Sequence, residues 1–378
     1  MLKKTLRGPA GLLVLLVLLA IAALIATGPQ LPDSGSNSAT WLQPGPYSVA
    51  SSEFTFVDSS RPTKANRGIP GKPERTLITT VWYPENAEGS LPLIIHSHGI
   101  VSERTELPYL MKALASRGYV VAAANFPLTS GATEGGANAT DIFNQPADVS
   151  FLIDSVIALS GEAKPFAGNI DVQRIGLTGF SLGGLTTYLT TFHPRWREER
   201  LAAAVAIAGP SAGFAAEFFS TTSIPFLAIS GTADALIEHR RNAADITERA
   251  DNSVLISIEG GSHLGFTGIA EPMLRFMSNP DSLGCAAVMA VLDEDPNDIF
   301  SQLGSAEEGV DMTRDLPGIC DYGYAETTHP GRQQMITQIA AVSFFESVFN
   351  ASAVARKQAL EQLKVGIARD FAEASFTD

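Results

Sequence analysis

The stretch Gly-Phe-Ser-Leu-Gly-Gly at residues 179–184 constrains the fold of this chain more than any other feature. Residues 174–178 before it are typical of a short buried strand, and residues 185–192 after it are typical of a helix. A Gly-x-Ser-x-Gly sequence between a strand and a helix forms a sharp turn that holds the serine in a strained backbone conformation. Glycine at 179 and 183 avoids the collisions that larger side chains would make. The pattern predicts that the Ser181 hydroxyl is exposed at the top of a sheet.

A nucleophilic serine needs a base and an acid that orients the base. Apolar runs at 201–208, 225–230 and 253–258 are expected to be strands, and the last two end in polar loops. The first of these loops is Gly-Thr-Ala-Asp, ending at Asp234, and the second is Glu-Gly-Gly-Ser-His, ending at His263. Serine, acid and histidine therefore follow strands in the order that such a site requires. We predict that Ser181 is the nucleophile, Asp234 the acid and His263 the base.

Two alternatives compete with this assignment. Asp234 could be an ordinary turn aspartate that hydrogen-bonds its own loop. His329 also follows Asp234 in the chain, but it precedes a proline in an irregular stretch. His239 follows as well, and it is too close in sequence to Asp234 to reach across the site.

The developing negative charge on the substrate needs backbone donors. Residues 92–95 read as a buried strand that leads into His-Ser-His-Gly-Ile at 96–100. A His-Gly turn at this place supplies one N–H, and the residue after the nucleophile supplies the other. We therefore expect the backbone N–H groups of Ile100 and Leu182 to form the oxyanion site. His96 and His98 are expected to hydrogen-bond within their loop, because no carboxylate or cysteine completes a zinc set.

With these motifs in place, the chain resembles α/β-hydrolases of the platelet-activating-factor acetylhydrolase and dienelactone-hydrolase-like group. The resemblance covers residues 45–349 and rests on the turn at 179–184, the His-Ser-His-Gly turn, the Gly-Thr-Ala-Asp loop and Gly-Ser-His-Leu-Gly-Phe at 261–266. Further similar segments are Gly-Pro-Tyr-Ser-Val at 45–49, Val-Trp-Tyr-Pro at 81–84 and Pro-Ala-Asp-Val-Ser-Phe at 146–151. Two departures are Ser181, where dienelactone hydrolases have cysteine, and Phe180, where lipase-like members often have histidine.

The expected activity is serine carboxylic-ester hydrolysis through the triad and the oxyanion site, without a metal or an organic cofactor. As in acetylhydrolase-like enzymes, the resemblance implies short-acyl or phospholipid-type esters as substrates. A polyester or cutinase-like hydrolase is the alternative among enzymes, because it shares the same order of site residues. A membrane-tethered binding protein that has lost activity is the alternative from another class. The preferred acyl and alcohol groups and the oligomeric state cannot be read from the sequence.

The resemblance implies one α/β-hydrolase domain over residues 45–350, a mostly parallel sheet with helices on both faces, and the composition agrees with a single large core. Helical spacing at 107–117, 148–159 and 333–349 and an apolar strand at 120–124 give the alternation that this fold needs. An insertion is expected at 280–325, and residues 351–378 are expected to contain a C-terminal amphipathic helix. The net charge of −14 argues against nucleic acid as a partner.

The N-terminal segment 1–28 has Lys3, Lys4 and Arg7 before an uncharged apolar run from 11 to 27. This run is longer than the usual secretory core of about 7–15 residues. It predicts a signal anchor, with a cleaved signal peptide as the alternative, and residues 29–44 as a flexible tether. The positive charges keep the N-terminus inside, so the rest of the chain is expected in the periplasm or outside. We expect the protein to be anchored to the membrane by this segment, or to be secreted if the segment is cleaved.

Cys285 and Cys320 are the only two cysteines. In an oxidising compartment they could form a disulfide that closes the insertion into one loop. Two unpaired buried thiols are the alternative.

Overall fold

The computed structural model describes residues 12–17, 27–159, 165–292, 296–314, 316 and 318–378. It divides into two units, residues 1–31 and residues 32–378, and the second contains all the strands described below. Among the residues that the structure describes, no helix has both the length and the apolar character that a membrane crossing requires. Most of the predicted anchor at 11–27 lies outside the described residues, so the anchor stays a prediction.

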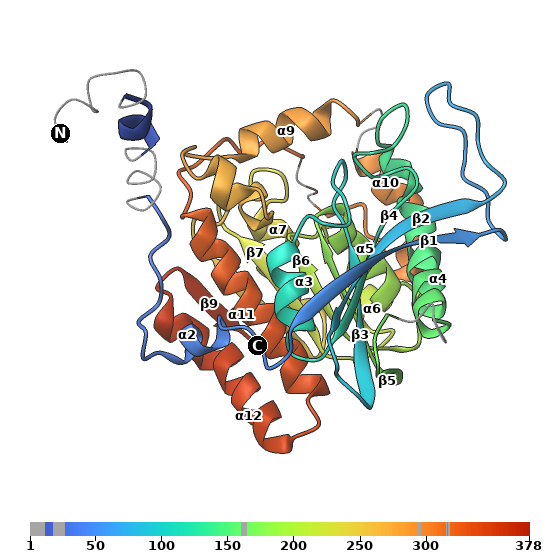
Figure 1. Ribbon diagram of the computed structural model, residues 1–378. Coiled ribbons are helices and arrows are strands. Elements are labelled where there is room, and N and C mark those ends of the chain that lie inside the picture. Colours follow the sequence, from blue (N-terminus) through green and yellow to red (C-terminus); the bar gives the residue numbers. More distant parts are fainter. Residues whose placement is uncertain (1–11, 18–26, 160–164, 293–295, 315, 317) are drawn as a thin grey trace. The chain divides into compact units, whose positions relative to one another are not determined.

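One mixed sheet of nine strands organises the larger unit, in the order β1-β2-β4-β3-β5-β6-β7-β8-β9 (Figure 1). The strands are β1 (Val49–Asp58), β2 (Arg75–Pro84), β3 (Ser90–Ser97), β4 (Val120–Asn125), β5 (Asn169–Phe180), β6 (Leu201–Ile207), β7 (Phe226–Gly231), β8 (Ser253–Ile258) and β9 (Ala374–Thr377). The six strands from β4 to β8 in this order are parallel, and the flanking pairs β1–β2, β2–β4 and β8–β9 are antiparallel. The predicted mostly parallel sheet is confirmed.

Helices cover both faces of this sheet (Figure 1). The helices of eight or more residues are α3 (Pro108–Ala115), α4 (Gln145–Ile157), α5 (Leu182–Phe192), α9 (Asp281–Met289), α11 (Pro330–Phe349) and α12 (Ala353–Glu361). Shorter helical segments are α2 (Asn37–Trp41), η2 (Ala139–Asn144), α6 (Ala216–Phe219), α7 (His239–Asn242), α8 (Ile246–Arg249), η4 (Leu264–Phe266), η5 (Ala270–Leu274), α10 (Pro296–Gln302), η6 (Ala306–Glu308), η7 (Gln362–Gly366) and α13 (Ile367–Asp370). Helices α4, α5 and α6 pack in the core of one face, and α3 and α11 pack in the core of the other.

Successive side chains of the central strands point alternately into these two cores. In β3, Leu93 and Ile95 pack with α4 and α5, whereas Ile94 between them packs with α3 and α11. All three are fully buried, as expected for a strand with helices on both sides. The sheet is therefore a rigid platform, and the loops after its parallel strands meet at one edge.

A buried ion cluster fixes the start of α4 against β2. Both Nε and Nη2 of Arg75 donate to Asp148, at 2.8 and 2.6 Å, and its Nη1 and Nη2 donate to Asp141, at 3.2 and 2.7 Å. All three side chains are almost completely buried. Because an unpaired buried carboxylate is costly, this cluster depends on the arginine.

The structure differs from the sequence expectation near both ends of the larger unit. Within the expected tether at 29–44, helix α2 is capped by the Ser36 side chain, and its Trp41 packs against the α11 core. The expected helix within 351–378 is present as α12, η7 and α13, but the chain then adds β9 to the sheet. Strand β9 is only four residues long, which is too short to show a periodic pattern.

Candidate active site

The turn between β5 and α5 holds Ser181 in a strained conformation, with φ 56° and ψ −119°. Positive φ is uncommon for a residue other than glycine and is typical of functional turns. A Cβ atom at Gly179 would collide with the backbone of Gly183, and one at Gly183 would collide with the backbone of Ser97. The two glycines are therefore required by close backbone packing, as the sequence predicted.

Ser181, His263 and Asp234 form one hydrogen-bonded chain. His263 Nε2 lies 2.8 Å from Ser181 Oγ, and His263 Nδ1 lies 2.8 Å from Asp234 Oδ2. Because the carboxylate accepts from Nδ1–H, Nε2 is left to accept the hydroxyl proton of the serine. The three residues follow β5, β7 and β8 in sequence, and the ends of these parallel strands bring them together.

The surroundings of His263 favour its charged form. Burial lowers the pKa of His263, but the charge and hydrogen bond of Asp234 outweigh it, with smaller contributions from Asp281 and Glu106. The pKa of His263 is consequently raised above its usual value near 6.5. Asp234 is held in place by its other oxygen, which accepts from the N–H groups of Leu236 at 2.9 Å and Ile237 at 2.7 Å. The arrangement suits a base that becomes an imidazolium during a reaction.

The predicted oxyanion loop lies directly against the serine. A Cβ atom at Gly99 would lie 3.1 Å from Ser181 Cβ, so this position requires a small residue. Among the described residues, neither the Ile100 N–H nor the Leu182 N–H donates to a backbone acceptor. Both residues line a pocket that also contains Ser181.

Glu106 is a buried carboxylate against this loop, and no sequence motif indicated it. It accepts from the Gly99 N–H at 3.1 and 3.2 Å and contacts His96 Nε2 at 3.0 Å. His98 accepts from the Phe126 N–H at Nε2 and donates from Nδ1 to the Gly99 carbonyl, so its ring is in the neutral form. Burial is the largest cause of the lowered pKa of His98. Only the contact of His98 with the Gly99 carbonyl lies within the loop, as expected; Glu106 and the Phe126 N–H, the other partners of the two histidines, lie outside it.

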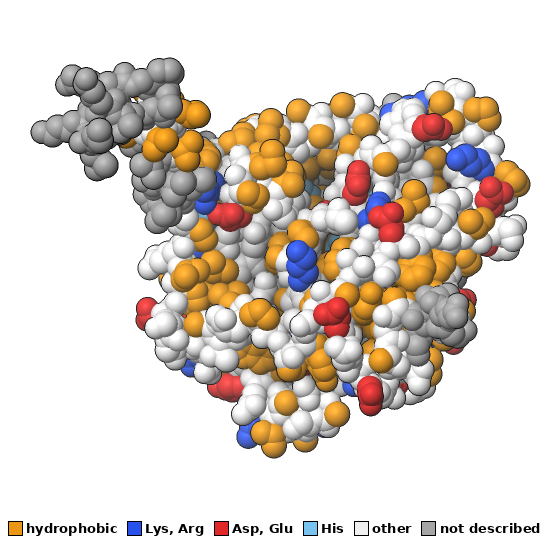
Figure 2. Space-filling model, in the orientation of Figure 1, with side chains coloured by type: hydrophobic (Ala, Val, Ile, Leu, Met, Phe, Trp, Pro, Cys, Tyr) orange, Lys and Arg blue, Asp and Glu red, His pale blue; other side chains and the backbone are white. Residues whose placement is uncertain are grey.

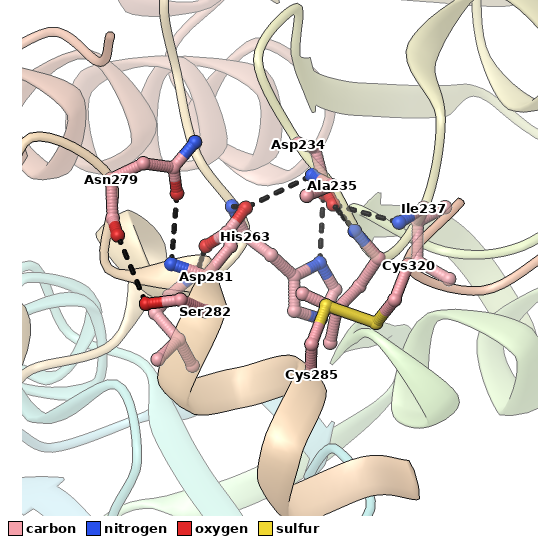
Figure 3. The surroundings of a disulfide bond; sticks show 11 residues. Asp234, Ala235, Ile237, His263, Asn279, Asp281, Ser282, Cys285 and Cys320 are labelled. Carbon is pink, nitrogen blue, oxygen red and sulfur yellow. Dashed lines mark hydrogen bonds and ion pairs between the residues drawn. A yellow bond between two sulfur atoms is a disulfide. The ribbon is translucent and has the colours of Figure 1, made fainter. Parts of the chain in front are cut away.

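Asp281 is a second carboxylate that sequence reasoning missed, and it joins the two loops that carry Asp234 and His263 (Figure 3). Its Oδ2 accepts from the N–H groups of Ala235 at 3.0 Å and His263 at 2.8 Å, and its Oδ1 accepts from Leu264 at 2.8 Å. Asp281 is fully buried at the start of α9. Burial, followed by the nearby charge of Asp234, raises its pKa. Asn-Pro-Asp at 279–281 is a recognisable helix start, but it does not reveal this contact.

A disulfide joins Cys285 to Cys320 beside these loops, which confirms the predicted pairing (Figure 3). Cys285 lies on α9, one turn after Asp281, and the Cys320 N–H donates to the Ala235 carbonyl at 3.0 Å. The disulfide thus closes the insertion at 280–325 on itself and joins its far end to α9, the helix that contacts both triad loops.

His329 has a different role from His263. It stands at the N-cap of α11, where its Nδ1 accepts from the Gly331 N–H at 3.0 Å. Its ring therefore caps a helix. The hydrogen-bonded partner of Ser181 is His263.

Two cavities meet at Ser181. A narrow pocket of about 90 Å³ has mainly aliphatic walls, formed by residues that include Leu185, Val288, Ile299 and Ile319. A wider cleft of about 620 Å³ lies on the other side and is lined by His263, among others. Helix α9 contributes to both walls through Val288.

A protein-family model described as PETase, PET hydrolase-like, matches residues 77–279, which is more than half of the chain. The matched segment contains Ser181, Asp234 and His263. No curated protein matches the chain.

Proposed function

The chain belongs to the PET hydrolase-like family, and from this premise we propose that it hydrolyses aliphatic polyesters with Ser181, His263 and Asp234. Family membership makes it a serine ester hydrolase with an α/β-hydrolase fold. The observation that supports the proposed residues is the continuous hydrogen-bond chain from Asp234 through His263 to Ser181.

In the proposed reaction, His263 Nε2 takes the proton of Ser181 while Oγ attacks the ester carbonyl carbon. The N–H groups of Ile100 and Leu182 donate to the resulting oxyanion. Asp234 stabilises the imidazolium and fixes the tautomer of His263. The imidazolium then protonates the leaving alkoxide, and the acyl-enzyme is hydrolysed by a water molecule that His263 deprotonates.

This proton transfer decides which cavity takes which half of the ester. The leaving alcohol must lie beside the group that protonates it, and His263 lines the wide cleft. Among the described residues, His263 is not part of the wall of the narrow pocket. The alcohol half therefore belongs in the cleft, and the acyl half belongs in the narrow pocket.

The size of the narrow pocket favours an aliphatic acyl group. A cavity of about 150 Å³ is known to hold a benzene ring, and this pocket has only about 90 Å³. Besides Ser181, its walls are aliphatic apart from Asn242 and Phe300, so they suit a short hydrocarbon chain. An aliphatic polyester unit such as succinyl fits this description better than an aromatic one.

The same pocket also favours a second candidate function, the hydrolysis of simple esters with short acyl groups. This is the activity implied by the resemblance to platelet-activating-factor acetylhydrolases. A large alcohol such as a lysophospholipid would occupy the cleft of about 620 Å³.

A substrate panel tests these proposals. Purified protein is assayed on p-nitrophenyl acetate, butyrate, octanoate and benzoate, and on particles of poly(butylene succinate) and poly(ethylene terephthalate). We expect turnover of the acetate, the butyrate and the succinate polyester, with at least tenfold lower kcat/KM for the octanoate and the benzoate. A Ser181→Ala control must be inactive. Turnover of small esters without any release from the succinate polyester would favour the second candidate, and preference for benzoate would contradict the assigned acyl pocket.

We further propose that the protein is exported, with 1–28 as an anchor or a cleaved signal. The disulfide between Cys285 and Cys320 supports this, because disulfides persist in oxidising compartments. Cell fractionation with N-terminal sequencing distinguishes the anchored form from the cleaved one. Recovery of the intact protein in the cytoplasm would contradict export.

A further inference from the structure

An unusually apolar surface surrounds the outer side of α9 and η5. Between residues 269 and 290 the exposed side chains are apolar except for Ser278, and we call the nine apolar ones the apolar patch. The patch consists of Ile269, Pro272, Met273, Phe276, Leu283, Ala286, Ala287, Met289 and Ala290. Its largest members are 50–69% exposed. Figure 2 shows hydrophobic side chains gathered along the edge of the molecule where Figure 1 places α9.

Charge is almost absent from this surface. Arg275 is nearly buried and pairs with Glu271 at 2.7 Å, and Asp281 points inward to the triad loops. The chain as a whole carries a net charge of −14, yet between residues 269 and 290 Glu271 is the only charged side chain with appreciable exposure, at 29%. Large exposed apolar patches on soluble proteins mark interaction sites. A surface helix normally has a polar outer side.

The patch continues into the cleft that contains Ser181. Ile269, Leu283 and Ala287 are exposed members of the patch, and they also line the cleft beside His263. This is the side to which the proposed mechanism assigns the leaving alcohol. In a polyester both halves of the cleaved ester continue into further repeat units. The part that continues from the alcohol half leaves through the cleft, and on this side it reaches the patch.

From this continuity we propose that the apolar patch is the docking surface for solid aliphatic polyester. The inference rests on the proposed function, because it takes the polymer as the occupant of the cleft. A polyester surface is neutral and rich in CH₂ groups, and it matches a patch that has no exposed lysine or arginine. An anionic membrane would be attracted by basic residues, which this patch lacks.

The test measures binding without turnover. Full-length Ser181→Ala protein is incubated with poly(butylene succinate) particles, and the protein left in solution is quantified over a range of particle areas. The patch variant adds Met273→Ser, Phe276→Ser and Met289→Ser, which are 57–69% exposed and do not line either cavity. We expect its partition constant to fall at least tenfold.

A matched control carries Val354→Ser, Leu360→Ser and Val365→Ser, which replace exposed apolar residues of α12 and η7. We expect this control to bind the particles as the parent does. In the background with intact Ser181, the patch variant should hydrolyse p-nitrophenyl butyrate at the parental rate, which shows that the fold and the site are intact.

Three results would overturn the proposal. The first is equal binding by the patch variant and the parent, and the second is an equal loss in the α12 control. The third is tighter binding of the parent to another partner than to polyester, with that binding lost in the patch variant. The partners tested are neutral phosphatidylcholine vesicles and, by sedimentation, a second copy of the chain. If the protein with intact Ser181 hydrolyses no ester but the patch-dependent binding is observed, the proposed function fails and the docking surface stands.

Discussion

Replacing Asp281 by asparagine tests whether one buried carboxylate positions both loops of the triad. The carboxylate accepts three backbone N–H groups, from Ala235, His263 and Leu264. An asparagine of the same shape has one acceptor oxygen, so its NH₂ group must face one or two of these donors. Hydrogen bonds to charged groups contribute about 1.5–3 kcal/mol each. We therefore expect a loss of about 2–4 kcal/mol in the free energy of unfolding.

The kinetic effect follows from the position of His263. A displacement of about 1 Å at a reacting group reduces the rate by about 100-fold. We expect Asp281→Asn to lower kcat by about 10–100-fold with little change in KM, because neither cavity is lined by Asp281.

The pH profile separates an effect on His263 from a general loss of structure. His263 acts as a base only when neutral, so kcat/KM falls as the pH drops below its pKa. Asp234, Asp281 and Glu106 all raise the pKa of His263, and the acid limb of the wild type is expected above pH 6.5. Removing the charge of Asp281 should move this limb to lower pH.

The assay is a pH–rate profile on p-nitrophenyl butyrate, combined with urea unfolding. The matched control is Asp311→Asn, a half-buried aspartate of the same insertion that accepts from the Thr313 N–H at 2.9 Å. It should leave kcat and the acid limb unchanged. The reasoning is refuted if folded Asp281→Asn has wild-type kcat and an unmoved acid limb, even when its stability is lower.

The remaining predictions concern the base, the disulfide and the buried ion cluster. His263→Ala should reduce kcat by about 10³-fold or more, whereas His329→Ala removes a helix cap and should lower only stability. Esterase activity and fluorophosphonate labelling measure this, and an inactive His329 variant beside an active His263 variant would overturn the triad. Cys285→Ser opens a loop with a sequence separation of 35 and should cost up to about 4 kcal/mol, and an unchanged melting temperature would contradict this. Arg75→Met removes the arginine shared by two buried carboxylates, leaving Asp148 with only Arg61 at 2.8 Å and Asp141 with the Asn144 amide at 2.7 Å, and should cost about 3–5 kcal/mol. Burial already raises the folded-state pKa of Asp148, and Arg75 opposes that rise. Without Arg75 this pKa should rise further above the unfolded value, so the cost in urea unfolding should shrink as the pH is lowered from 8 to 5. A pH-independent cost would argue against this.

The central part of the fold could be predicted because its signals are local. The strands that precede Ser181, Asp234 and His263 are short apolar runs, and the strained turn at the serine requires glycines at fixed positions. The predicted strand at 253–258 agrees with β8 residue for residue. The order of these strands then brings their loops together without further information.

The features that were missed depend on contacts between distant segments. Asp281 lies 46 residues from Ala235 in the chain, and Glu106 lies seven residues after Gly99 on an irregular loop. No periodicity links such residues to their partners. Strand β9 is recognised only by its pairing with β8, because four residues carry too little pattern. The apolar patch was missed because α9 has the composition of a buried helix, and only the structure reveals its exposed side.

Substitutions on the two sides of helix α9 are expected to have different effects. Its inner side holds Asp281, the disulfide and Val288, so a substitution there disturbs the triad loops or the acyl pocket. Its outer side reaches solvent, where most substitutions change stability by no more than about 0.5 kcal/mol. The residues that meet the substrate surface can therefore diversify while those that support catalysis stay fixed. A library restricted to Ala286, Met289 and Ala290 would explore affinity for different polymers without the usual loss of folded enzyme.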